Sequence, residues 1–218
     1  MNNEIKIIKI PCSKRVFDIV MASFLLLLSL PLVLFIITWI CVEQIFIKDS
    51  RGSLFYKEKR VSQGKIFEFY KWRTFKTKVI LEALKNGPVI HTARMQADLK
   101  NLTYYGRFLK RIYMDELPQL WNVLRGDVSL IGPRPEFADP VAFYSQDIPY
   151  YNIRHIIKPG LSGWAQIKQE GEPHHGIDVE ETRRKFSYDL YYIRNRNLWL
   201  DLSIGLKTIK ILLSRKGV

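Results

Sequence analysis

An uncharged apolar segment at residues 19–42 constrains this chain most, because leucine and isoleucine dominate it and no charged residue interrupts it. An apolar run longer than about 18 residues is typical of a membrane helix. Pro31, near the middle of the run, lacks a backbone donor and clashes with the carbonyl four residues earlier. We therefore expect a break in the helix near Pro31, with the Ser29 hydroxyl bonding a freed carbonyl.

Two membrane topologies are compatible with this segment. Each arm beside Pro31 would be roughly 18 Å long as a helix, too short for a hydrocarbon core of about 30 Å. Basic residues flank both ends, with Lys14 and Arg15 before the run and Lys48 and Arg51 after it. Because basic flanks favour the cytoplasmic side, a re-entrant helix–break–helix suits both ends. A kinked helix that spans the membrane is the alternative.

The composition sets the class of partner. The chain has 218 residues and a formal net charge of +13, which points to phosphorylated substrates, anionic lipid or nucleic acid. Its length suits an anchor plus one cored domain. We expect a membrane anchor at residues 1–48 and a compact cytosolic catalytic domain at residues 49–218.

The predicted fold class is α/β, mostly helical with a short β-hairpin. Residues 54–56 and 65–72 read as strands around a turn at residues 61–64. Helices are expected at residues 78–84, 93–99, 105–111, 117–124, 140–146, 179–192 and 198–213. The last of these is amphipathic, with Leu202, Leu206, Ile209 and Leu213 at helical spacing. It either lies on an anionic membrane surface or packs on the domain core.

Two adjacent acids, Asp115 and Glu116, lie at the head of the helix predicted at residues 117–124. Such pairs are usually helix caps or solvated side chains. A helix N-terminus also keeps a carboxylate ionised, and an ionised aspartate can attack phosphorus. A neighbouring glutamate can hold Mg²⁺, which binds one or two carboxylates together with substrate phosphates. The pair therefore predicts phosphoryl chemistry.

Basic residues that could bind phosphate lie near the acid pair or in motifs of their own. Arg134 is held between Pro133 and Pro135, which limits the backbone freedom of the arginine. Arginine matches phosphate oxygens with a planar fork, and lysine supplies a point charge. The predicted phosphate-binding residues are Lys71, Arg73, Lys110, Arg111 and Arg134. The adjacent His174 and His175 have no further ligand at metal-binding spacing, which favours a surface loop.

Several ordered motifs resemble the bacterial sugar transferase family, the small monotopic phosphoglycosyl transferases. These motifs are KRVFD at residue 14, FYKWRT at 69, DELPQLWNVLRGD at 115, IGPRP at 131, KPGLSGWAQ at 158 and YDLYY at 188. The resemblance implies transfer of a phosphosugar from a UDP-sugar to polyprenyl (undecaprenyl) phosphate, with release of UMP. It also implies Asp115 as a covalent nucleophile, Glu116 as the Mg²⁺ ligand, and Lys71, Arg73 and Arg134 at phosphate-binding positions.

The same resemblance implies a place in the cell and a set of partners. The enzyme would work at the cytoplasmic face of the bacterial inner membrane, in contact with phospholipid, and would start the assembly of exopolysaccharide, capsule, O-antigen or another glycan. No nucleic acid is expected, and a homo-oligomer is compatible with the sequence. The rival reading is a non-enzymatic membrane adaptor that binds anionic lipid or nucleic acid through its basic surface.

Three positions depart from the family pattern. Leu30 precedes Pro31 where the family has serine, and Lys110 replaces an arginine five residues before the nucleophile. The third departure is Lys168-Gln169-Glu170, where the family has Asn-Gly-Arg. An arginine thought to help bind the donor is therefore missing at Glu170, which leaves the identity of the sugar open.

Overall fold

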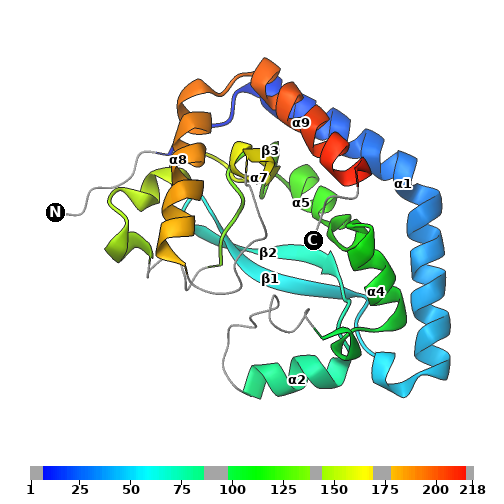
Figure 1. Cartoon of the computed structure of the whole chain (residues 1–218). Coiled ribbons are helices and arrows are strands. Elements are labelled where there is room, and N and C mark those ends of the chain that lie inside the picture. The colour runs from blue at the N-terminus through cyan, green and yellow to red at the C-terminus, as the bar shows by residue number, and fades with distance from the viewer. Residues whose placement is uncertain (1–6, 86–97, 138–143, 169–177, 215–218) are drawn as a thin grey trace. The chain divides into compact units, whose positions relative to one another are not determined.

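A computed structural model describes residues 7–85, 98–137, 144–168 and 178–214 (Figure 1). These residues are mostly helical with two small two-stranded sheets. The predicted fold class, mostly helical with a short β element, is confirmed, and the second sheet is an addition to it. They form two compact units. The first unit comprises Met1–Ser23, Glu58–Phe69 and Leu120–Val218, and the second comprises Phe24–Lys57 and Tyr70–Gln119. The predicted functional boundary at residue 48 stays a prediction.

The apolar segment forms a single continuous helix, α1 (Cys12–Phe46), with Pro31 inside it. The predicted break is therefore not confirmed, because the loss of one backbone donor leaves the rest of the helical hydrogen bonds intact. Ser29 Oγ does bond a carbonyl, that of Leu26, at 3.0 Å. Among the described residues α1 is the helix long and apolar enough to cross a membrane, and 11% of its most apolar window is buried. Its exposed side chains include Leu27, at 72%.

The hairpin predicted from the strand pattern is present. It consists of β1 (Phe55–Ser62) and β2 (Lys65–Trp72), and β1 extends well beyond its predicted end at residue 56. Gln63 and Gly64 join the strands with φ angles of 50° and 77°. Two consecutive left-handed residues match the twist of a tight hairpin, and glycine adopts this conformation without a Cβ clash.

The second unit packs the latter part of α1 against short helices. Its elements are η1 (Lys48–Ser50), α2 (Thr77–Lys85), η2 (Leu99–Asn101), α4 (Tyr104–Arg111) and η3 (Met114–Glu116). Ile36 and Ile40 of α1 form a buried core with Trp72, Tyr105 and Leu109. The helices predicted at residues 78–84 and 105–111 are confirmed as α2 and α4. The helix predicted at 93–99 lies mainly outside the described residues.

The first unit contains a parallel strand pair that the sequence did not reveal. Strand β3 (Ser129–Ile131) pairs with β4 (Gly160–Ser162), in a register that puts Ser129 opposite Gly160. The unit also contains α5 (Gln119–Arg125), η4 (Tyr151–Ile156), α7 (Trp164–Lys168), α8 (Val179–Asn195) and α9 (Leu198–Leu213), of which α5 begins in the second unit. Three-residue strands carry too little alternation to be recognised. The predicted helix at 140–146 lies partly outside the described residues.

The helix predicted at residues 198–213 is confirmed as α9, and the structure shows which of its side chains are buried (Figure 1). Ile204 is fully buried and belongs to a core with Ile131 and Tyr192. Leu206 and Trp199 are exposed, at 60% and 82%. The apolar stripe that the sequence pattern identified is therefore not the face that packs on the core.

Gly160→Ala should lower the free energy of unfolding by at least about 2 kcal/mol, because an added Cβ would lie 2.0 Å from Gly132 N. Denaturant titration of the detergent-solubilised protein would measure this. The matched control is Gly205→Ala in α9, where an added Cβ meets nothing within 4 Å. The control should be neutral or stabilising by up to about 1 kcal/mol. Equal effects of the two changes would contradict the close β3–β4 approach.

Candidate active site

The acid pair lies in η3, between α4 and α5. Tyr113 turns the chain after α4 in a left-handed conformation, with φ of 56°. Asp115 is buried, and Leu117 N closes the short helix by donating to the Met114 carbonyl at 3.2 Å. Helix α5 begins at Gln119, two residues later than predicted. The pair therefore precedes α5 by a turn and does not lie in the first turn of that helix.

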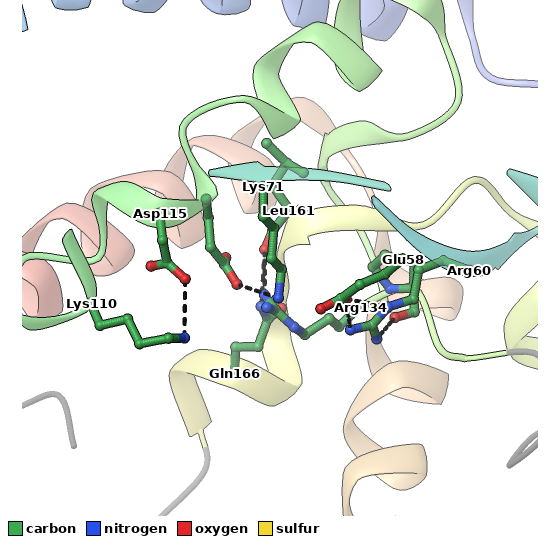
Figure 2. A network of polar contacts seen from close by, with 10 residues as sticks. Glu58, Arg60, Lys71, Lys110, Asp115, Arg134, Leu161 and Gln166 are labelled. Atoms are coloured by element: carbon green, nitrogen blue, oxygen red, sulfur yellow. Dashed lines mark hydrogen bonds and ion pairs between the residues drawn. The ribbon is translucent and has the colours of Figure 1, made fainter. Parts of the chain in front are cut away.

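Two lysines from other segments of the second unit meet the acid pair. Lys110 Nζ, from the last turn of α4, lies 3.4 Å from Asp115 Oδ2. Figure 2 shows these two side chains pointing toward each other. Lys71 Nζ, from β2, lies 3.7 Å from Glu116 Oε1. Tertiary structure thus gives each acid a cationic neighbour, and both cations are among the predicted phosphate-binding residues.

Burial controls the ionisation of the Lys110–Asp115 pair. Burial raises the pKa of the Asp115 carboxyl above its ordinary value, although Lys110 acts in the opposite direction. Burial likewise lowers the pKa of Lys110, and the Asp115 charge partly offsets this. The charge of each group therefore favours the ionised form of the other. Because Asp115 lies four residues before Gln119, the first residue of α5, it is not in the first turn of that helix, where a helix dipole acts most strongly.

The other two predicted cations of the second unit lie in different environments. Arg73 is buried, and its guanidinium donates to backbone carbonyls at Ser53 (2.6 Å), Phe75 (2.8 Å) and Ser50. This geometry favours a structural role over the predicted phosphate contact, because the fork is already engaged. Arg111, the last residue of α4, is exposed.

Arg134 belongs to the first unit, in a loop whose backbone is fixed on both sides. Gly160 N donates to the Pro133 carbonyl at 2.9 Å, and Arg60 Nη1 donates to the Pro135 carbonyl at the same distance. The Arg134 side chain is half-buried, and its Nη1 donates to the Leu161 carbonyl at 3.4 Å (Figure 2). The predicted rigid presentation of this arginine is therefore supported by hydrogen bonds as well as by the two prolines.

A buried ion network, which sequence reasoning missed, supports the same loop. Arg154 Nη2 lies 2.7 Å from Asp189 Oδ2 and 3.3 Å from the Arg134 carbonyl. Arg154 Nη1 pairs with Glu136, which also accepts from the Tyr151 hydroxyl. The available signals were an acid directly after the Pro-Arg-Pro motif and a second acid inside an aromatic helix. Neither signal identifies Arg154 as the partner of the two acids, because Glu136, Arg154 and Asp189 come from segments that are distant in the sequence.

Two predicted features remain: the metal ligands, and the segment Lys168-Gln169-Glu170, which replaces the Asn-Gly-Arg of the family. Across the described ranges, no group of three or more His, Cys, Asp or Glu side chains forms a metal cluster. His174, His175, Gln169 and Glu170 lie outside the described residues. The acid pair thus remains the carboxylate set on which a metal proposal can rest.

Arg154→Met should lower the free energy of unfolding by about 3 kcal/mol, because the buried Asp189 and the half-buried Glu136 would keep their carboxylates without their cation. Chemical denaturation followed by tryptophan fluorescence would measure the loss. Arg183→Met is the matched control, because Arg183 pairs with Glu180 on the exposed surface of α8 at 3.6 Å. The control should cause no measurable change. Similar losses in both variants would argue against the buried network.

Comparison with known proteins identifies the family. Residues 10–215 match the bacterial sugar transferase family. The chain is 37% identical to UDP-N-acetylgalactosamine-undecaprenyl-phosphate N-acetylgalactosaminephosphotransferase of Aeromonas hydrophila, covering 94% of this chain and 44% of the relative. It is 36% identical to undecaprenyl-phosphate galactose phosphotransferase of Salmonella typhimurium (94% and 41%) and 34% identical to the uncharacterized sugar transferase EpsL of Bacillus subtilis (94% and 89%). The chain spans less than half the length of the first two relatives. Because the family match covers residues 10–215, the chain belongs to the bacterial sugar transferase family.

Proposed function

We propose that this protein transfers a phosphosugar from a UDP-sugar to undecaprenyl phosphate and releases UMP. The observation that carries the proposal is the buried Asp115 carboxyl 3.4 Å from Lys110, at the head of the motif shared with the family. Two of the relatives are named as undecaprenyl-phosphate sugar phosphotransferases. The step would start the assembly of a membrane-linked glycan.

The proposed chemistry has two displacements at one phosphorus. An Asp115 carboxylate oxygen bonds to the β-phosphorus of the donor, and the bond to the bridging oxygen breaks, so UMP leaves with the electron pair. A phosphate oxygen of undecaprenyl phosphate then attacks the same phosphorus, and the carboxylate of Asp115 is released. Lys110 contributes by favouring the ionised, nucleophilic form of Asp115.

The residues around the acid pair suit Mg²⁺ bound together with the donor. Glu116 presents a partly exposed carboxylate beside the buried Asp115, and no larger ligand cluster occurs in the described parts of the chain. Mg²⁺ commonly binds one or two protein carboxylates plus substrate phosphates. When bound, it would neutralise charge on the transferring phosphate. Glu116 would hold it, and Lys71, 3.7 Å from Glu116, would bind donor phosphate.

The remaining phosphate-binding assignments follow the family motif and the chemistry of the side chains. Arg134 has a backbone fixed by hydrogen bonds and a half-buried guanidinium, which suits a phosphate oxygen. Arg111 is an exposed cation next to Lys110 and would contribute as a charge. Arg73 is not retained among the phosphate ligands, because its donors already bond backbone carbonyls.

The anchor is proposed to be re-entrant at the cytoplasmic leaflet of the inner membrane, with Pro31 at its deepest part. Near the start of α1, Lys14 Nζ pairs with Asp201 at 2.7 Å and Arg15 Nη1 donates to the Val123 carbonyl at 2.6 Å. Near its end, Glu43 bonds the backbone of α4. Both ends of α1 thus bond segments that follow the apolar run. The basic residues that flank both ends of the run, Lys14 and Arg15 before it and Lys48 and Arg51 after it, favour the same side of the membrane for both ends.

Asp115→Asn should abolish UMP release, because an amide cannot form the acyl phosphate. Purified protein in detergent would be incubated with Mg²⁺ and a panel of UDP-sugars, with and without undecaprenyl phosphate. UMP release would identify the sugar, and intact mass without acceptor should show a phosphosugar adduct on the wild type but not on Asp115→Asn. A membrane adaptor would release no UMP in either form. Turnover without an adduct under single-turnover conditions would rule out the covalent route.

Cysteine labelling tests the anchor topology. In a background with Cys12 and Cys41, both exposed and free, changed to serine, Asn3→Cys and Asp49→Cys would place one thiol before α1 and one after it. A membrane-impermeant maleimide should label both thiols when it is added on the cytoplasmic side of sealed vesicles. It should label neither thiol when it is added on the opposite, periplasmic side. Labelling from opposite sides would establish a spanning helix instead.

A further inference from the structure

Glu43 is a buried acid near the end of helix α1, directly after the uncharged run at residues 19–42. Burying a carboxylate costs several kcal/mol unless hydrogen bonds replace its water. Here Oε1 accepts from Tyr104 N at 3.0 Å and Oε2 accepts from Tyr105 N at 2.9 Å. The Ser50 hydroxyl donates to Oε1 at 2.6 Å. The carboxylate is therefore satisfied by the backbone of another helix.

The two backbone groups that Glu43 binds belong to the first turn of α4. The first N–H groups of a helix have no partner within it and need an acceptor from outside. Thr103 Oγ1 accepts from Gly106 N at 3.0 Å, which is the usual cap from the preceding residue. Glu43 supplies the acceptors for Tyr104 and Tyr105. A negative charge at this end of α4 is also favoured by the helix dipole.

Apolar packing on the same face of α1 strengthens this link. Ile36, Ile40 and Glu43 recur at helical spacing, and the two isoleucines pack in one buried cluster with Tyr105 and Leu109 of α4. Met114, which directly precedes Asp115, packs against that cluster. The face of α1 that ends in Glu43 is thus the face that supports α4 and the start of η3.

The other end of α4 carries Lys110, whose ammonium group lies 3.4 Å from Asp115. This distance is longer than the roughly 2.7–2.9 Å of a charge-assisted hydrogen bond, so a small further shift of α4 would separate the two groups. Helix α4 has eight residues, about two turns, so a displacement of its first turn would also move its last turn. Geometry at Asp115 therefore depends on the cap at the far end of α4.

We infer that Glu43 is a positioning residue, which couples the apolar helix α1 to the reacting carboxylate by fixing α4 and, through α4, Lys110. The inference rests on the proposed function. Glu43 would touch neither substrate nor metal. Its effect would be exerted on the rate of the chemical step, because correct placement of reacting groups lowers the barrier more than it strengthens donor binding.

The test compares Glu43→Ala and Glu43→Gln with the wild type in lipid nanodiscs, using UMP release with Mg²⁺ and the UDP-sugar identified above. Glu43→Ala should lower kcat by at least about tenfold and change KM for the donor less than about twofold. Glu43→Gln, which keeps one acceptor oxygen, should lie between the two. Asp49→Ala, which removes an exposed carboxylate from η1, is the matched control and should leave kcat unchanged.

A double-mutant cycle with Lys110→Met separates positioning from a loss of folded protein. If Glu43 acts through Lys110, Glu43→Ala should cause no further fall in kcat in the Lys110→Met background. Multiplying effects of the two changes, or a loss of activity that follows only the folded fraction measured by thermal unfolding, would overturn the inference. Absence of UMP release from the wild type would instead refute the proposed function. That outcome differs from failure of the Glu43 inference, in which the wild type releases UMP.

Discussion

The cost of removing a charged group from water governs the candidate active site of this protein. Asp115 is buried, and burial raises the pKa of its carboxyl above the ordinary value. Lys110 opposes that tendency from 3.4 Å and is itself buried enough to be pushed toward neutrality. The pair is therefore mutually dependent, and any element that holds Lys110 in place also controls the chemistry available to Asp115. Helix α4 is that element.

The same cost explains why the basic residues divide into two kinds. Arg73 and Arg154 are buried. The Arg73 guanidinium donates to backbone carbonyls and the Arg154 guanidinium pairs with carboxylates, so both side chains hold the surrounding loops in place. Lys71 and Arg134 remain partly accessible, and each lies in a segment that such a buried arginine helps to hold. The net charge of +13 thus overstates the positive charge that these residues leave free to meet an anion.

Local features were predictable because neighbouring residues determine them. The β1–β2 hairpin follows from alternating strand residues around Gln63-Gly64, and α8 and α9 follow from long helical patterns that begin after the caps Asp178 and Asn197. The predicted break at Pro31 was not confirmed, because a missing hydrogen bond can be tolerated inside a long helix. The β3–β4 pair escaped prediction because parallel pairing joins distant three-residue segments.

The sequence alone determined the long apolar helix, the acid pair and the proline-held arginine, since apolar length, adjacency and local rigidity are properties of consecutive residues. It also identified Lys71 and Lys110 as cations without assigning a partner to either. Only the tertiary structure decided that Lys110 faces Asp115, that Arg73 is internal, and that Glu43 caps α4. These outcomes depend on which distant groups share a buried environment, and the energy of a buried charge is set by those neighbours.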